Sequence, residues 1–465
     1  MSQLEIGLDP QLPAEFAAAL HQHLAQSWPD LSWTPLRLPA PRRDARDGPL
    51  LAVLREDAPP PPGDPGELAV VSWPEAAAPA DLDALFLQLD LEIARITARR
   101  RGRPPEREVS PPPREMTRRA LLQIPLPLGR PLPPAPWLEA EMCVHASGCE
   151  LCLSACPANA LSFAGRSPVI AADLCTGCGA CAAACPTGAI TGAYLGEGQW
   201  QAALAALAAH PSPLPLALRC PKGPKPDPGI VTLPVACIGE VGWHHLLTAL
   251  AETGRLPALS CDQGDCPLRP QAEAALARLE LLQTIELPSG GPAQPAEAEG
   301  QGAPPASRRG AIVSSLRRLR PFLPDGLHAK TLPGLGWTVH ALEGENRCTL
   351  CSGCLNVCPT GALAIAEEAE ATVLRIDAGL CTGCGACSRI CPEQAIEVGA
   401  ATVRDLISPQ DVVHAQKTRC KGCGAAYEAP TFVTALRRRM EAAGYSGVLV
   451  ERLDYCPECR AALPR

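Results

Sequence analysis

Cysteine is the residue type that dominates the chemistry available to this chain. The 465 residues include 24 Cys, none of them before Cys143, in groups of eight, four, eight and four. A cytosolic protein keeps its thiols reduced, so cysteines in such numbers are expected to bind metal rather than to form disulfides. We find no Ser-His-Asp or Cys-His set, no convincing carboxylate pair and no nucleotide-binding loop. The sequence therefore predicts soft-metal chemistry, and whether the chain is an enzyme stays open.

Each group of eight is a pair of four-cysteine runs. Three runs have the spacing C-x2-C-x2-C-x3-C-P, and every run continues into Pro-x-x-Ala followed by Leu or Ile. The runs are Cys143, Cys149, Cys152 and Cys156; Cys175, Cys178, Cys181 and Cys185; Cys348, Cys351, Cys354 and Cys358; and Cys381, Cys384, Cys387 and Cys391. The first run departs from the spacing because five residues separate Cys143 from Cys149. One small unit is thus used four times.

The spacing within a run has a mechanical reason. Three Cys at three-residue steps wrap a loop around one corner of a cubane cluster, and Gly177, Gly179, Gly383 and Gly385 permit the positive φ angles that such a loop needs. We expect backbone amides of the loop to point at the cluster sulfurs. We also expect the fourth Cys to lie where a short helix begins, with the following Pro at the first helical position.

The runs resemble the bacterial two-cluster [4Fe–4S] ferredoxin family over about residues 140–195 and 345–400. In that family the fourth Cys of a run ligates the other cluster. The resemblance implies four clusters, held by Cys143, Cys149, Cys152 and Cys185; by Cys175, Cys178, Cys181 and Cys156; by Cys348, Cys351, Cys354 and Cys391; and by Cys381, Cys384, Cys387 and Cys358. His145 is an alternative to Cys143, which we favour because thiolate ligation is the rule. Structural zinc on all sixteen would not predict the trailing Pro or the paired runs.

The middle group, Cys220, Cys237, Cys261 and Cys266, has no C-x2-C step. Short apolar runs precede three of these Cys and alternate with helical patterns, which predicts a small parallel α/β unit with thiols at the carboxyl ends of its strands. The expected elements are runs at Leu214–Arg219, Val231–Ala236, Leu256–Ser260 and Thr284–Leu287, and helices at Trp243–Thr253 and Gln271–Leu281. On the helix, we expect His244 and His245 to be one surface and one half-buried residue rather than ligands.

This middle stretch resembles the small iron–sulfur subunit of methyl-viologen-reducing hydrogenases, on Ala236-Cys237-Ile238-Gly239 and Ser260-Cys261-Asp262 through Cys266-Pro267. The resemblance implies one [2Fe–2S] cluster on the four Cys and an electron-relay role. An additional Cys that the family often carries near the first is absent beside Cys220. The alternative is that the four are buried structural thiols of an α/β core.

The last group consists of two C-x2-C knuckles, Cys420 with Cys423 and Cys456 with Cys459. Two such turns form a tetrahedral site of four sulfurs, for which we favour one zinc ion over a rubredoxin-like iron or another cluster. Thr431–Ala443 between them is a basic helix, expected to be a solvated face or a partner-docking face.

Taken over the whole chain, these patterns predict a multi-domain α/β and α+β protein. It would consist of two ferredoxin-like dicluster domains, a small parallel α/β domain and a C-terminal zinc-ribbon-like module, with an N-terminal region before them. Its first hundred residues alternate between a helix at Ala14–Ser27, apolar runs at Leu50–Arg55 and Leu68–Trp73, and an amphipathic helix through Leu82 and Ile96. The expected divisions are a small α/β domain of unknown role (1–100), an Arg/Pro-rich linker (101–136), dicluster domain 1 (137–198), the hydrogenase-subunit-like domain (199–288), a flexible linker (289–308), dicluster domain 2 (309–402) and a four-cysteine metal-binding module (403–465).

With every thiol assigned as a ligand, the function expected is electron transfer. The formal net charge of -8 argues against a nucleic-acid binder, and thiolate-rich clusters make the protein more negative still, which favours low potentials. We expect a cytoplasmic relay for low-potential electrons, without a transmembrane segment or small-molecule substrate, whose partner is a formate dehydrogenase, hydrogenase or heterodisulfide-reductase-like enzyme. The alternative is an iron–sulfur assembly or redox-sensing factor for a molybdenum or hydrogenase enzyme.

Overall fold

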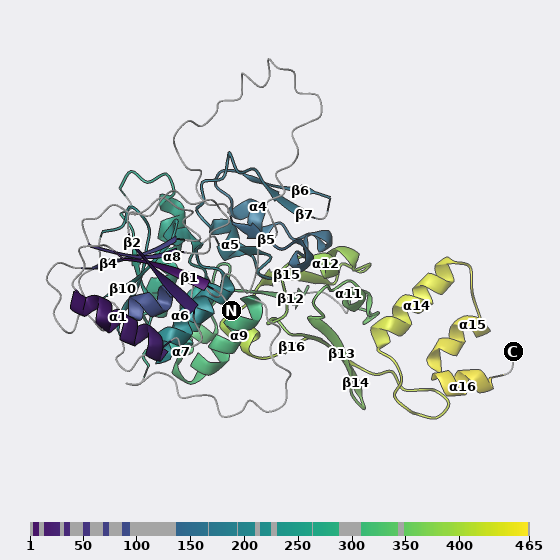
Figure 1. The fold of residues 1–465 in the computed structure, drawn as a ribbon. Helices are drawn as coiled ribbons and strands as arrows, with labels where there is room; N and C mark the ends of the chain where they lie inside the picture. The colour runs from purple at the N-terminus through teal and green to yellow at the C-terminus, as the bar shows by residue number, and fades with distance from the viewer. Residues whose placement is uncertain are drawn as a thin grey trace, which may run out of the picture.

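A computed structural model gives the arrangement of the chain (Figure 1). It describes residues 3–8, 14–27, 32–37, 50–55, 68–73, 86–93 and 136–463, the last range without 166, 193, 210–213, 225–229, 263, 288–307 and 343–347. The linkers expected at 101–136 and 289–308 therefore lie outside the described residues, apart from Pro136 and Arg308. In the described part, no helix combines the length and apolarity needed to cross a membrane.

The N-terminal unit is built on a four-stranded parallel sheet of order β2-β1-β3-β4. Its elements are β1 (Gln3–Leu8), α1 (Ala14–Ser27), β2 (Ser32–Arg37), β3 (Leu50–Arg55) and β4 (Leu68–Trp73). The helix and the two apolar runs expected here have the predicted bounds, whereas β1 and β2 were not predicted. Strand β2 contains Pro35, which cannot donate a ladder hydrogen bond, and accordingly it lies at the edge of the sheet.

Helical residues 86–93 join the N-terminal unit to the middle of the chain. His23 of α1 stacks on Phe86 with ring centroids 4.5 Å apart and lies 2.9 Å from the Asp90 carboxylate. From the same helix, Gln88 exchanges side-chain hydrogen bonds with both backbone groups of Thr232 in the edge strand β10. The helix thus satisfies polar groups of a strand edge that would otherwise be open.

The middle unit (residues 197–287) has a three-stranded parallel sheet of order β10-β9-β11 with three long helices. Its elements are α6 (Glu197–Ala209), β9 (Leu216–Arg219), β10 (Val231–Pro234), η3 (Ile238–Glu240), α7 (Trp243–Thr253), β11 (Ala258–Ser260) and α8 (Arg269–Leu282). The expected runs and helices occur near their predicted bounds, except that Thr284–Leu287 is not a strand. Helix α7 is buried over most of its length and shares one hydrophobic core with β9 and β10.

Two units carry the cysteine runs, and we call them the first (136–192) and second (337–400) repeat units. In each, the first and last strands pair antiparallel, and a second antiparallel pair lies between them. The first contains β5 (Trp137–Leu138), η1 (Ala140–Met142), η2 (His145–Ser147), α4 (Leu151–Ala155), β6 (Leu161–Ala164), β7 (Ser167–Ile170), α5 (Ala180–Ala184) and β8 (Ile190–Thr191). The second contains β12 (Trp337–Ala341), α11 (Gly353–Asn356), β13 (Leu363–Glu367), β14 (Ala371–Ile376), α12 (Ala386–Ile390) and β15 (Ile396–Ala400). The sequence repeat is therefore also a structural repeat.

The second repeat unit is flanked by helices that share the core of the middle unit. These are α9 (Arg308–Leu319), η4 (Arg320–Phe322), α10 (Asp325–His328) and α13 (Val403–Ile407). Leu316 of α9 and Leu406 of α13 belong to the same buried cluster as Leu246 of α7. One hydrophobic core therefore ties the second half of the chain to the middle unit.

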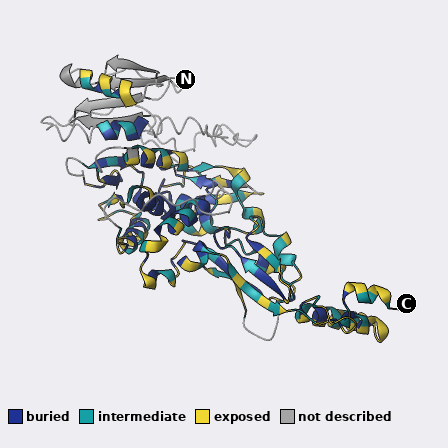
Figure 2. Ribbon diagram, turned by 90° about the horizontal axis from the view of Figure 1, so that it is seen from below, coloured by how far each residue is buried: buried dark blue, intermediate teal, exposed yellow. Residues whose placement is uncertain are grey.

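The C-terminal module projects from the rest as a mostly exposed lobe (Figure 2). It follows β16 (Gln410–Gln416), which pairs with β14, and contains α14 (Pro430–Ala442), α15 (Val448–Glu451), η5 (Arg452–Asp454) and α16 (Pro457–Ala462). Helix α14 is the expected basic helix. Arg438 and Arg439 pair with Glu393 of the second repeat unit, at 3.1 and 2.8 Å, so these exposed charges join the lobe to its neighbour.

The helix expected to begin at the fourth Cys of a run instead ends there. Cys156, Cys185 and Cys391 are the C-caps of α4, α5 and α12, and their ψ angles of 109°, 115° and 112° are extended. A residue before Pro is sterically disfavoured in helical conformation, so the Cys-Pro step stops the helix. The prediction of a helix start was wrong because this restriction outweighs the preference of Pro for the first helical turn.

Positive φ angles occur at the same positions of two runs with different residues. Gly383 and Gly385 have φ of 71° and 72°, as the sequence predicted, whereas Leu350 and Ser352 occupy the corresponding places with φ of 55° and 63°. A residue with a Cβ pays a steric penalty in this region. The run from Cys348 therefore holds backbone strain that the run from Cys381 avoids.

Replacing Ser352 with glycine should relieve this strain. We expect Ser352→Gly to raise the free energy of unfolding by about 1 kcal/mol, seen as a higher thermal midpoint by circular dichroism. The control Ser388→Gly places glycine inside α12, where φ is negative, and should lower the midpoint instead. A midpoint unchanged or lowered in Ser352→Gly would contradict the account.

Candidate metal centres

The first repeat unit brings its eight thiols into two groups of four. Set 1 is Cys143, Cys149, Cys152 and Cys185, and set 2 is Cys156, Cys175, Cys178 and Cys181. Burial raises the pKa of Cys152 to about 11, with further contributions from the other three thiols of set 1. Burial likewise raises the pKa of Cys181, and the other three thiols of set 2 add to the effect. Each set therefore contains the fourth Cys of the opposite run.

The second repeat unit repeats this crossed arrangement. Set 3 is Cys348, Cys351, Cys354 and Cys391, and set 4 is Cys358, Cys381, Cys384 and Cys387. The pKa of Cys348 is raised by burial and by nearby Cys391 and Cys351. Burial raises the pKa of Cys387, and Cys384 and Cys358 raise it further. The same crossing in both units indicates that it is a property of the repeat.

Three of these sets surround cavities. The four thiols of set 4 line one small cavity, those of set 2 line a second and those of set 3 line a third. The remaining walls are mostly apolar, including Val339 and Ile376 around set 4 and Leu161 and Ile170 around set 2. A cavity walled by four sulfurs and hydrocarbon suits a compact inorganic core rather than an organic ligand.

The charges of the thiols also fit such a core. Burial raises the pKa of Cys354 and of Cys381 to about 11, and neighbouring thiols add to both shifts. Four buried thiolates repel one another, so they can be charged together only when a cationic centre lies between them. The donor set is all sulfur, as [4Fe–4S] cores require.

Backbone amides point at the sulfurs that cross between sets. The N–H groups of Ala160, Ala362 and Ala395 donate to Cys156, Cys358 and Cys391, each at 3.3 Å. Each donor is the Ala of the repeated Pro-x-x-Ala segment. The turn after each of these Cys therefore places a hydrogen-bond donor on the crossing sulfur, which stabilises its thiolate form.

The irregular first run still places Cys143 with its set. Cys143 is among the thiols that raise the pKa of Cys149, after burial and Cys185. His145 is engaged elsewhere: its Nδ1 lies 3.0 Å from the Cys149 carbonyl oxygen, and its ring stacks on Phe163. The longer loop therefore brings the thiol of Cys143, rather than the imidazole of His145, into set 1.

The middle set, Cys220, Cys237, Cys261 and Cys266, lies at the carboxyl ends of the parallel strands. Cys220 and Cys261 directly follow β9 and β11, and Cys237 follows β10 by three residues. Burial raises the pKa of Cys261 to about 12, with Cys220, Cys237 and Cys266 as further causes. The four thiols are thus neighbours at one sheet edge, as the strand pattern predicted.

The C-terminal set, Cys420, Cys423, Cys456 and Cys459, is more compact than the other sets. Its four sulfurs all lie within 4.8 Å of one another, and those of Cys423 and Cys456 are 3.8 Å apart. A tetrahedral ion with metal–sulfur bonds of about 2.3 Å places its sulfurs about 3.8 Å apart. N–H groups of Cys456 and Gly422 donate to the Cys420 sulfur, and such backbone bonds lower the pKa of Cys420 to about 6. This geometry fits a single ion.

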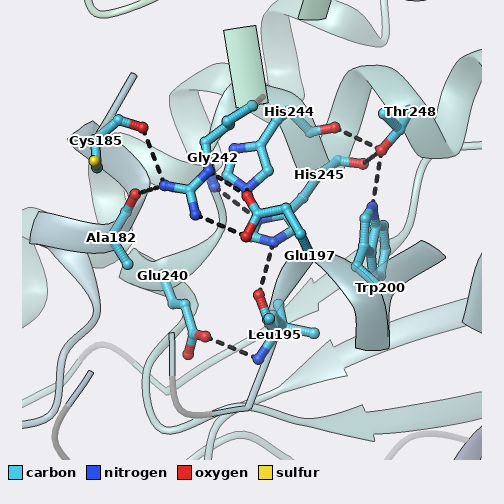
Figure 3. Close-up of polar contacts among 12 residues, drawn as sticks. Ala182, Cys185, Leu195, Glu197, Trp200, Glu240, Gly242, His244, His245 and Thr248 are labelled. Atoms are coloured by element: carbon cyan, nitrogen blue, oxygen red, sulfur yellow. Dashed lines mark hydrogen bonds and ion pairs between the residues drawn. The ribbon is translucent and has the colours of Figure 1, made fainter. Parts of the chain in front are cut away.

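A buried polar network that the sequence did not reveal lies beside Cys185 of set 1 (Figure 3). Arg308 pairs with Glu197 and donates to the carbonyl oxygens of Ala182, Cys185 and Ile190. Burial alone would raise the pKa of Glu197, but Arg308 holds that pKa below its usual value. Through these contacts, Arg308 of α9 connects the middle unit to helix α5, which ends at Cys185 of set 1. The only sequence signal was two adjacent Arg after a Gly- and Pro-rich stretch.

Glu240 is a second buried carboxyl in this region. It is 1% exposed and its Oε1 accepts from the Leu195 N–H at 2.9 Å (Figure 3). A Cβ on Gly179, which follows Cys178 of set 2, would lie 2.5 Å from the Glu240 Cβ. Burial raises the pKa of Glu240 to about 7 despite its backbone hydrogen bonds. Glu240 therefore packs directly against the loop of set 2.

His244 and His245 are both buried, which corrects the prediction of one surface and one half-buried residue. They are 3% and 2% exposed, because α7 packs against α6, α8 and α9. Gly242 N–H donates to His245 Nδ1 at 3.2 Å, so Nε2 carries the proton and faces the Leu195 carbonyl oxygen at 3.3 Å. Burial lowers the pKa of His245 to about 4, so the imidazole is neutral and structural.

Comparison with known proteins identifies the repeat units. The family model described as "4Fe-4S dicluster domain" matches residues 142–189 and again residues 347–395. No curated protein matches the chain significantly. The two matches coincide with the two crossed pairs of thiol sets. The chain therefore carries two 4Fe-4S dicluster domains, and these support an iron–sulfur electron-transfer role.

Proposed function

We propose that this protein is a multi-centre relay for low-potential electrons. Sets 1 to 4 would each hold one [4Fe–4S] cluster, which takes up and releases single electrons. The observation that carries the proposal is the crossed pairing of thiols, in which Cys156, Cys185, Cys358 and Cys391 each belong to the set of the other run. This pairing is the one that two-cluster ferredoxins use.

We also propose occupants for the two other sets. The middle set would hold a [2Fe–2S] cluster, which is supported by its place at the carboxyl edge of a parallel sheet and by the resemblance to the hydrogenase iron–sulfur subunit. The C-terminal set would hold one zinc ion, which is supported by its short sulfur–sulfur distances. That closed site would fold the module and carry no electrons.

The electron partner is proposed to be a redox enzyme of the formate dehydrogenase, hydrogenase or heterodisulfide-reductase class. All-thiolate ligation in a chain of formal net charge -8 favours low reduction potentials, which match such partners. Within the relay, the chain's own residues hold the sulfurs, donate N–H groups to them and exclude water. Buried cations then set differences between sites.

Arg309 is the clearest of these cations. Its side chain is 4% exposed, donates to the Leu335 carbonyl oxygen and lies over the Trp337 ring at 5.0 Å. Among the ion pairs between described residues, none includes Arg309. Burial raises the pKa of Cys381 in set 4, and the charge of Arg309 offsets part of that rise. Its neighbour Arg308, by contrast, is neutralised by Glu197. The charge of Arg309 is therefore available to balance the negative charge of a cluster in set 4.

The first test of the proposed function is the iron content of the protein. Anaerobically purified protein should contain about 18 Fe and, after reduction by dithionite, give EPR signals of reduced clusters. Cys143→Ala should lose about four Fe, the content of one cubane, whereas His145→Ala should retain them. Colourless, EPR-silent protein would overturn the proposal, and iron loss in His145→Ala alone would reassign the ligand of set 1.

Removing the charge of Arg309 should lower one reduction potential. Electrons make a cluster more negative, so a buried cation stabilises the reduced form, and Arg309→Gln should shift one of the four cubane potentials downward in an EPR redox titration. Arg309→Lys should retain much of the wild-type value, and Arg375→Gln, at an exposed ion pair with Asp411, should leave all potentials unchanged. Four wild-type potentials in an iron-loaded Arg309→Gln protein would refute this role.

The C-terminal ion should depend on every thiol of its set. Cys423 is exposed, so Cys423→Ser removes a ligand with little loss of packing, and we expect elemental analysis to show one zinc fewer with the iron content unchanged. Glu458→Gln, between Cys456 and Cys459, should retain the zinc. Equal zinc in wild-type and Cys423→Ser protein would exclude the four-thiolate site.

A further inference from the structure

The junction between the middle unit and the first dicluster domain places one thiol set against another. A Cβ on Gly239 would lie 3.4 Å from the Cys237 sulfur and 3.4 Å from the Cys178 carbonyl oxygen. Cys237 belongs to the middle set and Cys178 to set 2. Cys178 is also among the thiols whose charge affects Cys237. The middle set therefore adjoins set 2.

The two dicluster domains meet at a different set. Arg389 lies between two ligands of the last run, and its guanidinium donates to the Cys384 carbonyl oxygen at 3.0 Å and to the Ser147 carbonyl oxygen. Ser147 and Gly148 directly precede Cys149 of set 1, while Cys384 belongs to set 4. One side chain, 242 residues from its acceptor Ser147, thus clasps the loop of set 1 to the loop of set 4.

Within each dicluster domain, the crossing ligands keep the two sets adjacent. Cys156 leaves the helix that carries Cys152 of set 1 and enters set 2. In the second domain, Cys387 of set 4 is near enough to Cys354 of set 3 to contribute to its raised pKa. The junction with the middle unit uses set 2, and the junction between the dicluster domains uses sets 1 and 4. No set therefore has more than two neighbouring sets, and the sets can be ordered without a branch.

We propose that the sites form one unbranched series: the middle set, set 2, set 1, set 4 and set 3, with Arg389 as the positioning residue that closes the gap between the dicluster domains. The proposal rests on the proposed function, because it orders the clusters which that function requires. One electron passes at each step, so that one site is oxidised as its neighbour is reduced, and no bond forms or breaks. The electrons come from the low-potential partner enzyme, or from dithionite in the test.

The exposure of the thiols agrees with this order. Among sets 1 to 4, the one exposed Cys is Cys351 of set 3, at one end of the series. At the other end, Cys261 and Cys266 of the middle set are partly exposed. The middle set and the three interior sets each contain two buried and two partly exposed Cys, so exposure distinguishes only the set 3 end of the series. Set 3 is therefore the most accessible site of the series, and electrons would enter or leave there.

The order is tested by opening the clasp. Arg389→Ala should keep the full iron content but lose the magnetic interaction between set 1 and set 4 in the EPR spectrum of the reduced protein. Electrons delivered in substoichiometric amounts should also equilibrate more slowly between the two domains in rapid-freeze samples. The matched control Arg438→Ala removes an arginine that pairs with Glu393 inside the second half of the chain and should leave both measurements as in wild type.

The outcomes separate the order from the function. If wild-type protein carries no clusters, the proposed function fails before the order is examined. If Arg389→Ala is iron-loaded and its spectrum and equilibration rate equal those of wild type, the series is wrong. If Arg389→Ala does not load iron, the same measurements on Gly148→Ala decide, because its Cβ would lie 2.2 Å from Arg389 Nη2 and force the clasp apart.

Discussion

Mutual repulsion among buried thiolates is the constraint on which the rest of the structure depends. In every set of the two dicluster domains, burial and neighbouring thiols together raise the pKa of at least one Cys. Such a group is unstable as four anions and would be stabilised by a cationic core, so metal binding would be coupled to the folding of these domains. The apolar clusters of these domains contain several of the same Cys, including Cys152, Cys181, Cys381 and Cys387, so little hydrophobic core exists apart from the metal sites. The inorganic cores would therefore complete the packing as well as carry electrons.

The larger core lies elsewhere, and it determines how the dicluster domains are held. Helices α7 and α9 pack together in one buried cluster that also receives α13 and the helical residues 86–93. Arg308 and Arg309 begin α9, and from there the Arg308 guanidinium binds the Cys185 carbonyl oxygen of the first repeat unit while the Arg309 guanidinium lies over the Trp337 ring of the second. The rigid α-helical core thus supports both domains from a single helix end.

The local chemistry could be predicted well from the sequence, whereas the long-range contacts could not. Cys spacing, the positive φ at Gly383 and the strands before Cys220 and Cys261 follow from neighbouring residues, and the structure has them where the pattern placed them. The prediction of a helix starting at Cys156 was wrong because Pro both favours the first turn of a helix and disfavours a helical conformation in the residue before it. Here the second effect is the stronger. The burial of His244 and the roles of Arg308 and Arg389 depend on residues up to 242 positions away, which no local pattern encodes.

The contacts between units use the same backbone segments that hold the metal sites. Arg308 binds the carbonyl oxygens of Ala182 and Cys185, and Arg389 binds those of Ser147 and Cys384. A carbonyl can accept such a bond with fixed geometry only when its loop is ordered, and clusters bound by the Cys of these loops would hold them in place. Buried or bridging polar contacts also favour one docking arrangement, since a shifted one leaves donors unsatisfied. Alignment of the units would therefore depend on loading of the sites, so a chain that has lost one interior centre would also lose the alignment that the neighbouring centres need.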